Sequence, residues 1–239
     1  MVMRPSSHIF PGVKARIDRD LTSIRDTIDH IRPFAFHPAL NAISKAQTND
    51  TDPFWINDYV FEGDARAMCG MIGAYKPGTV LEIGSGNSTK FMKWASRAFN
   101  ADTQIVSIDP QPRAAIDSLC ARTIRKSLLD VDPSEFAALK AGDFVFMDGS
   151  HLTFNGTDTT YFFLEALPVL KPGVIVHVHD ITLPYEYIDE FTERGYSEQY
   201  MLATAILNNP NYRVLLPVYY ANKLNMFMAG GGSFWMVAP

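Results

Sequence analysis

The stretch Thr79-Val-Leu-Glu-Ile-Gly-Ser-Gly-Asn-Ser-Thr89 decides the fold of this chain. Its short apolar run ends at two glycines, Gly84 and Gly86, and apolar residues then recur at helical spacing from Phe91 to Phe99. The pattern predicts a strand, a tight turn and the start of a helix. Glycine lets the backbone approach a ligand closely, and the free N–H groups at a helix start favour a polar or anionic group.

Glu82 argues against a pyrophosphate ligand at this turn. Its carboxylate would repel phosphate groups, and Thr89 stands where the dinucleotide-binding fingerprint has its third glycine. The turn therefore favours a nucleoside ligand that lacks phosphates and has a cationic end. S-adenosylmethionine (SAM) has both properties, whereas a nicotinamide dinucleotide is disfavoured.

The composition is that of an ordinary globular α/β protein. Of the 239 residues, 47% are hydrophobic and 20% are charged, and the net charge of −5 disfavours sequence-independent binding of nucleic acid. Cys69 and Cys120 cannot make a disulfide framework, which favours a reducing compartment. The chain has no signal-peptide pattern and no run of 18 apolar residues. We therefore expect a cytoplasmic protein that binds neither nucleic acid nor membrane.

Apolar runs alternate with helical patterns through the C-terminal three-quarters of the chain. After the strand at 79–83, further strands are expected at 104–108, 122–125, 143–147, 174–178, 212–216 and 233–237. Strands that alternate with helices predict βαβ units and a parallel sheet, and nearly continuous apolar strands fit a sheet covered on both faces. Because no helix-length pattern separates the last two strands, the final one is expected to run antiparallel.

The N-terminal part is expected to add helices to this sheet. Residues 14–32 show a helical pattern that Pro33 is expected to end, with an apolar seam at 4-3-4-3 spacing formed by Ile17, Leu21, Ile24, Ile28 and Ile31. The seam fits either packing on the same chain or a homodimer contact. Residues 33–60 are irregular and rich in aromatics, and 64–75 form a helix. We divide the chain into an N-terminal helical extension, 1–60, and a SAM-binding domain, 61–239.

The segment Leu81-Glu-Ile-Gly-Ser-Gly86 resembles the first motif of the class I SAM-dependent methyltransferases, an acidic residue and two glycines after the first strand. The expected reversed last strand is similar to that of the same family. Over about residues 60–239 the resemblance implies a Rossmann-like α/β fold. It implies a seven-stranded, mostly parallel sheet with a reversed last strand, helices on both faces, and the N-terminal helical extension in addition.

The resemblance also assigns the SAM-binding residues. Ligands of open α/β sheets bind at the carboxyl ends of the strands. Asp109 ends the second strand, where this family places an acidic side chain on the ribose hydroxyls, and Ser127 and Leu128 follow the third, where it contacts adenine. The expected SAM-binding residues are Glu82, Gly84, Ser85, Gly86, Asn87, Ser88, Asp109, Ser127, Leu128 and Asp148.

Four polar residues, Asp148, His151, His179 and Asp180, follow two strands that are expected to be neighbours. Two carboxylates and an imidazole suit a hard divalent ion, and His151 could reach the same acceptor and serve as a base. The catechol O-methyltransferases and the macrolide sugar O-methyltransferases show similar patterns. They imply Asp148 and His151 as catalytic residues, and Asp148, His179 and Asp180 as ligands of Mg²⁺ or Mn²⁺. His179 departs from both families, which makes Mg²⁺ less favoured and leaves open Mn²⁺, Fe²⁺ or a polar rim without metal.

These observations predict one function and leave two alternatives. The resemblance implies SAM-dependent O-methylation of a small-molecule hydroxyl. A metal-free N- or carboxyl-methyltransferase and a non-catalytic SAM-binding module remain as alternatives. His177 is expected to be a hydrogen-bonded core residue, and the aromatic loop 184–196 either covers the acceptor or packs against the domain.

Overall fold

The computed structural model describes residues 4–239 and contains a seven-stranded sheet in the order β3-β2-β1-β4-β5-β7-β6. The strands are β1 (Thr79–Ile83), β2 (Gln104–Ile108), β3 (Arg122–Ile124), β4 (Phe144–Met147), β5 (Ile175–Val178), β6 (Arg213–Pro217) and β7 (Phe234–Val237). Strands β1 to β5 run parallel to one another, whereas β7 lies antiparallel between β5 and β6. The predicted mixed sheet with a reversed last strand is confirmed.

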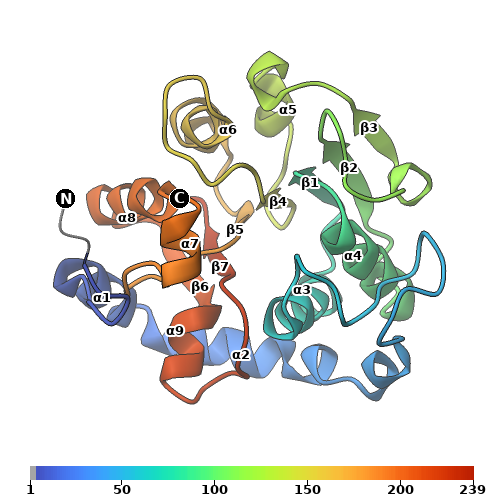
Figure 1. Ribbon diagram of the computed structural model, residues 1–239, viewed down its shortest axis with the longest axis horizontal. Helices are drawn as coiled ribbons and strands as arrows, with labels where there is room; N and C mark the ends of the chain where they lie inside the picture. Colours follow the sequence, from blue (N-terminus) through green and yellow to red (C-terminus); the bar gives the residue numbers. More distant parts are fainter. Residues whose placement is uncertain (1–3) are drawn as a thin grey trace.

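Helices cover both faces of this sheet (Figure 1). Helices α2 (Leu21–Ala35), α3 (Glu62–Tyr75) and α4 (Asn87–Ala98) pack side by side on one face. The opposite face carries α5 (Ser134–Ala137), α6 (Asp158–Tyr161) with the π-helical turn η4 (Phe162–Ala166), and α8 (Glu198–Asn208). The remaining helices are α1 (Pro11–Asp18), α7 (Asp189–Glu193) and α9 (Val218–Lys223), and the short 3₁₀ turns are η1 (Pro38–Ala42), η2 (Asp117–Leu119), η3 (Leu128–Asp130) and η5 (Leu167–Val169).

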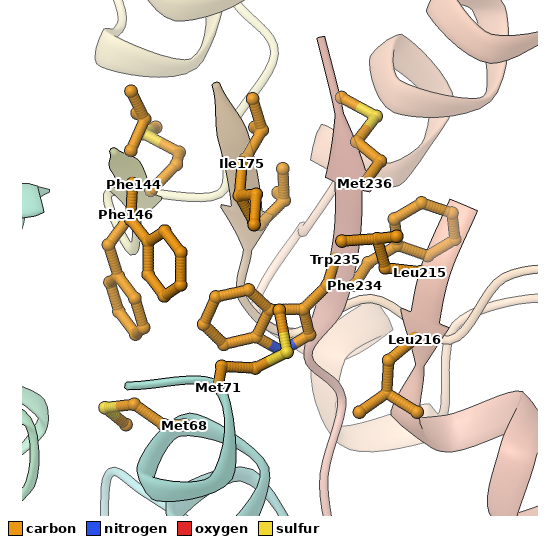
Figure 2. Close-up of a cluster of buried hydrophobic side chains, with 14 of the residues drawn as sticks. Met68, Met71, Phe144, Phe146, Ile175, Leu215, Leu216, Phe234, Trp235 and Met236 are labelled. Atoms are coloured by element: carbon orange, nitrogen blue, oxygen red, sulfur yellow. The ribbon is translucent and has the colours of Figure 1, made fainter. Parts of the chain in front are cut away.

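The core between the sheet and α3 is built around Trp235 of β7. Figure 2 shows Met68 and Met71 of α3 pointing toward the indole of Trp235 and the ring of Phe146. All four side chains are at most 1% exposed. Because burial of a large apolar side chain contributes about 1.5–3 kcal/mol, this cluster fixes α3 against the centre of the sheet.

The N-terminal helical pattern forms two helices, α1 and α2, instead of the single helix expected over 14–32. The chain turns at Arg19–Asp20, and α2 continues past Pro33 to Ala35. Ile17, Ile24 and Ile28 are at most 2% exposed inside the chain's own core. Of the two interpretations of the seam, packing on the same chain is correct, because these isoleucines leave almost no surface for a partner. Whether the chain forms a homodimer by another surface stays a prediction.

The turn between α1 and α2 holds the outer strand β6. The backbone N–H of Val214 donates to Asp20 Oδ2 at 2.7 Å, and the buried Arg16 guanidinium donates to the carbonyls of Pro210 and Tyr212. An outer strand presents unpaired backbone groups, and these side chains satisfy some of them. This long-range role of Asp20 explains why the helix breaks where the local pattern continues.

One other element differs from expectation. A short helix, α9, connects β6 and β7, where the sequence showed no helix-length pattern. In the aromatic loop after β5, Tyr187 and Phe191 pack into the domain and are 1% and 5% exposed. Within residues 4–239, no helix combines the length and the apolar character that crossing a membrane requires.

Candidate active site

A cavity of about 490 Å³ lies at the carboxyl ends of β1, β2 and β4. Of the residues expected to bind SAM, those that line it are Gly84, Ser85, Gly86, Asn87, Ser88, Asp109, Ser127, Leu128 and Asp148. Glu82 is the exception and lies behind the wall. Tyr59, Gln111, Arg113 and Leu152 also line the cavity. The guanidinium of Arg113 lies 5.0 Å from the ring centroid of Tyr59, so two distant segments meet at the mouth.

Gly84 permits the close approach of β1 and β4 at this edge. Its φ is +74°, and a Cβ there would lie 1.8 Å from the carbonyl oxygen of Asp148. A side chain would therefore push the turn away from the end of β4. The glycine thus brings the SAM-type turn and the Asp148 carboxylate to the same cavity.

Glu82 supports the turn from below. Its carboxylate is fully buried and accepts hydrogen bonds from the hydroxyls of Ser88 and Thr89, each at 2.6 Å. Both donors belong to the first turn of α4, so Glu82 fixes the start of that helix on β1. Burial raises the pKa of Glu82 to about 8, against the two hydrogen bonds that lower it.

Glu82 makes stability fall as pH rises. The pKa of Glu82 is about 8 in the folded chain and 4.5 ordinarily, so between these values the folded state holds a proton that the unfolded state has lost. Glu82→Gln removes this difference and should gain stability relative to the unmodified chain from about pH 5 to 8, on the order of a few kcal/mol. Urea unfolding at several pH values measures the gain. The exposed Glu165→Gln is the control, and a pH-independent difference for Glu82→Gln would contradict the prediction.

Asp109 presents its carboxylate at the end of β2. The backbone N–H of Ser85 donates to Oδ2 and that of Gln111 donates to Oδ1, each at 2.8 Å. These two bonds fix the carboxylate in the cavity wall beside the glycine turn. Each carboxylate oxygen has a further lone pair with which it can accept a ligand hydroxyl.

The residues of the cavity fit SAM on two observations. Gly86 lines the cavity, and a Cβ there would meet no protein atom within 4 Å, so its missing side chain leaves room for a ligand. Asn87 Oδ1 is buried without a hydrogen-bond partner in the described part of the chain, although buried polar atoms are normally paired. This oxygen could accept a hydrogen bond from an ammonium group, such as that at the methionine end of SAM.

The four polar residues expected at the next strand ends do converge. His151 Nε2 lies 3.3 Å from Asp148 Oδ1 and 3.6 Å from Asp180 Oδ2, and His179 Nε2 lies 3.6 Å from Asp180 Oδ1. His151 and Asp180 both adopt left-handed backbone, with φ of +60° and +54°. Such conformations are uncommon for residues other than glycine and cluster at functional sites.

The histidines and carboxylates of this cluster shift one another's pKa values. Burial lowers the pKa of His151, but hydrogen bonds to Asp148 and Glu198 outweigh burial and hold that pKa well above its ordinary value of 6.5. Burial favours the neutral form of Asp148, but His179 and His151 hold its pKa below the ordinary value. The contacts with these carboxylates therefore favour the protonated form of His151.

This arrangement does not form a metal site as it stands. Within residues 4–239, no group of three His, Cys, Asp or Glu side chains is arranged to hold an ion. Asp148 and Asp180 instead both face Nε2 of His151, and a cation would have to compete with that ring for the two carboxylates. His179 is buried at 1% exposure.

His177 is a core residue, as expected, but it is not hydrogen-bonded. Its ring stacks on Phe146 with centroids 3.7 Å apart, and neither ring nitrogen has a partner among the described residues. Burial holds its pKa well below 6.5, so this imidazole is neutral. Tyr196, by contrast, reaches the site, because its ring centroid lies 4.4 Å from that of His151.

Sequence reasoning missed Glu198. This residue begins α8, is fully buried, and places Oε2 2.9 Å from Nδ1 of His151. The two residues are 47 positions apart, and no local pattern connects them. Only the fold brings the start of α8 to the loop after β4.

Comparison with known proteins identifies a methyltransferase domain in this chain. Residues 81–181 match the model of a family described as methyltransferase domain. None of the curated proteins matches the chain. Residues 81–181 thus match a methyltransferase domain, and the sheet order with the reversed β7 is the one that the resemblance to class I SAM-dependent methyltransferases predicted.

Several solved structures are also similar to this chain. The MycE methyltransferase of the mycinamycin biosynthetic pathway, in complex with Mg and SAH, is 22% identical with a TM-score of 0.37; the match covers 56% of this chain and 37% of that one. The SAH-bound Podospora anserina methyltransferase PaMTH1 is 15% identical, with coverage of 98% and 90% and a TM-score of 0.45. Cofactor-bound Rv0187 from MTB is 15% identical, with coverage of 99% and 98% and a TM-score of 0.44. The chain thus spans little more than a third of the length of MycE.

Proposed function

We propose that this chain transfers the methyl group of SAM to a hydroxyl of a small molecule, and that His151 takes the proton of that hydroxyl. The observation that supports the proposal is the cluster beside the cavity, in which His151 Nε2 faces Asp148 and Asp180 at 3.3 and 3.6 Å. Asp148 also lines the cavity, so the cluster adjoins the cofactor space.

The chemistry explains why a hydroxyl is favoured. SAM supplies the electrophilic methyl group, so the protein must hold the acceptor in line and remove its proton. A carboxylate is already an anion and a neutral amine is already nucleophilic, so these acceptors need less activation than a hydroxyl does. His151 Nε2, once the imidazole is neutral, takes the proton of the attacking hydroxyl, and Asp148 and Asp180 can accept hydrogen bonds from a neighbouring hydroxyl of the acceptor. A non-catalytic SAM-binding module has no use for this base.

A divalent ion on Asp148, His179 and Asp180 is kept as a second form of the proposal. The two aspartates offer the oxygen ligands that Mg²⁺ prefers, and the MycE structure is a complex with Mg and SAH. Because the side chains as they lie do not fit an ion, we derive no step of the reaction from one.

Methyl transfer to a panel of acceptors tests the proposal. The panel holds a catechol, a simple phenol, a methyl glycoside, a primary amine and a carboxylic acid, and formation of S-adenosylhomocysteine (SAH) and of the methylated product is measured. We expect methyl ethers from hydroxyl compounds and no product from the amine or the acid. Products from the amine or acid alone would overturn the proposal. Repeating the assay with EDTA, and then with added Mn²⁺, decides on the ion: loss and recovery of turnover would establish the second form.

A further inference from the structure

The side chain of Glu198 is held against one edge of His151. Glu198 Oε2 lies 2.9 Å from His151 Nδ1, and both side chains are buried. The backbone is fixed as well, because the carbonyl oxygen of His151 accepts hydrogen bonds from the N–H groups of Ser197 and Glu198, at 2.8 and 3.2 Å. Three hydrogen bonds thus join His151 to the start of α8.

The other edge of the same ring faces the acceptor side. Nε2 lies beside Asp148 and Asp180, and Asp148 is a wall residue of the cavity. The ring of Tyr196 packs on the imidazole at 4.4 Å between centroids. Nδ1 of the imidazole is therefore hydrogen-bonded to Glu198 of α8, and Nε2 lies on the side of Asp148 and the cavity.

We propose that Glu198 is a positioning residue that keeps the proton of neutral His151 on Nδ1 and so presents an unprotonated Nε2 to the acceptor. The inference rests on the proposed function, in which His151 takes the acceptor proton. The hydrogen-bond partner of one imidazole nitrogen decides which nitrogen carries the proton, and a carboxylate requires a donor. Histidine whose Nδ1 has no such partner favours the opposite tautomer, with the proton on Nε2, which cannot accept a proton there.

The surroundings of Glu198 support this role over simple packing. Its other oxygen, Oε1, is buried without a partner in the described part of the chain. His151 is thus the side chain that compensates the buried carboxylate, together with the N-terminus of the eleven-residue helix α8. A residue that only filled space at this position would not need a carboxylate.

Nitrogen-15 NMR of the His151 ring tests the position of the proton without any acceptor. In the unmodified chain we expect the neutral imidazole, reached at high pH, to carry its proton on Nδ1. Glu198→Ala should move it to Nε2, and Glu198→Gln, whose amide oxygen can still accept, should keep it on Nδ1. The exposed Glu193→Ala is the control, and SAH binding by calorimetry confirms that each variant is folded. An Nδ1 proton that persists in Glu198→Ala overturns the inference.

Kinetics with the hydroxyl acceptor found in the panel give the second readout. Glu198→Ala should lower kcat about 10- to 100-fold with KM for SAM unchanged, and Glu198→Gln should recover most of the loss. In a His151→Asn background, Glu198→Ala should cause no further loss. The NMR result could show that Glu198 controls the tautomer of His151 while the kinetics show full activity of His151→Asn. That combination would support the positioning role of Glu198 and refute the proposed function. Equal losses in both backgrounds would refute the positioning role.

Discussion

Replacing His151 by asparagine is expected to lower kcat about 10²- to 10⁴-fold, with SAH affinity nearly unchanged. The amide cannot take a proton near neutral pH. Asparagine is chosen because it tolerates the left-handed backbone of this position, where φ is +60°, and can still hydrogen-bond the surrounding carboxylates. His151 does not line the cofactor cavity, so binding of SAH should be spared. Steady-state kinetics and calorimetry measure the two quantities.

The pH dependence gives this prediction a second check. Hydrogen bonds to Asp148 and Glu198 hold the pKa of His151 well above 6.5. The imidazole therefore loses its proton at a higher pH than an ordinary histidine does. The rate should therefore rise with pH through and beyond neutrality. His30→Asn, on the exposed surface of α2, serves as the control. Full activity of His151→Asn would mean that another group takes the proton.

Replacing Asp109 by alanine is expected to weaken SAH binding about 10- to 150-fold. A hydrogen bond to a charged group contributes roughly 1.5–3 kcal/mol, which corresponds to this range of affinity. The substitution also leaves the N–H of Ser85 without its acceptor at the glycine turn, so the loss should fall in the upper part of the range. Calorimetric titration with SAH measures it.

Two variants make the Asp109 prediction specific. Asp109→Asn keeps an oxygen for Ser85 and loses the charge, so its affinity should lie between those of alanine and the unmodified chain. Asp26→Ala removes an exposed carboxylate from α2 and should bind SAH normally. An unchanged affinity of Asp109→Ala would remove Asp109 from the ribose position.

The features that the sequence predicted depend on neighbours in the chain. The turn at Gly84 and Gly86 and the strands were readable because apolar runs and glycines give local signals. The convergence of Asp148 with Asp180 followed from one topological rule, that parallel strands end at the same edge of a sheet.

The features that were missed depend on contacts between distant segments. Asp20 breaks the N-terminal helix because its carboxylate accepts from Val214, 194 positions away. Glu198 reaches His151 across 47 positions, and Tyr59 reaches Arg113 from a separate segment. The seam of isoleucines gave the right period but could not say which surface it packs on, because a helix face buried in its own chain and one buried in a partner look alike in sequence.

The insertion of β7 between β5 and β6 sets the order in which the protein can assemble on the ribosome. Strand β6 has β7 as its neighbour in the sheet, so residues 213–217 cannot pair until residues 234–237 have been synthesised. Until then the outward side of β5 stays open, and Trp235 is missing from the centre of the core. Because unpaired strands are prone to aggregate during synthesis, the nascent chain is most exposed just before its last strand emerges. Ribosome-bound chains arrested before residue 234 should therefore be cleaved by protease within β6. Chains in which residues 234–237 have left the ribosome should resist cleavage there.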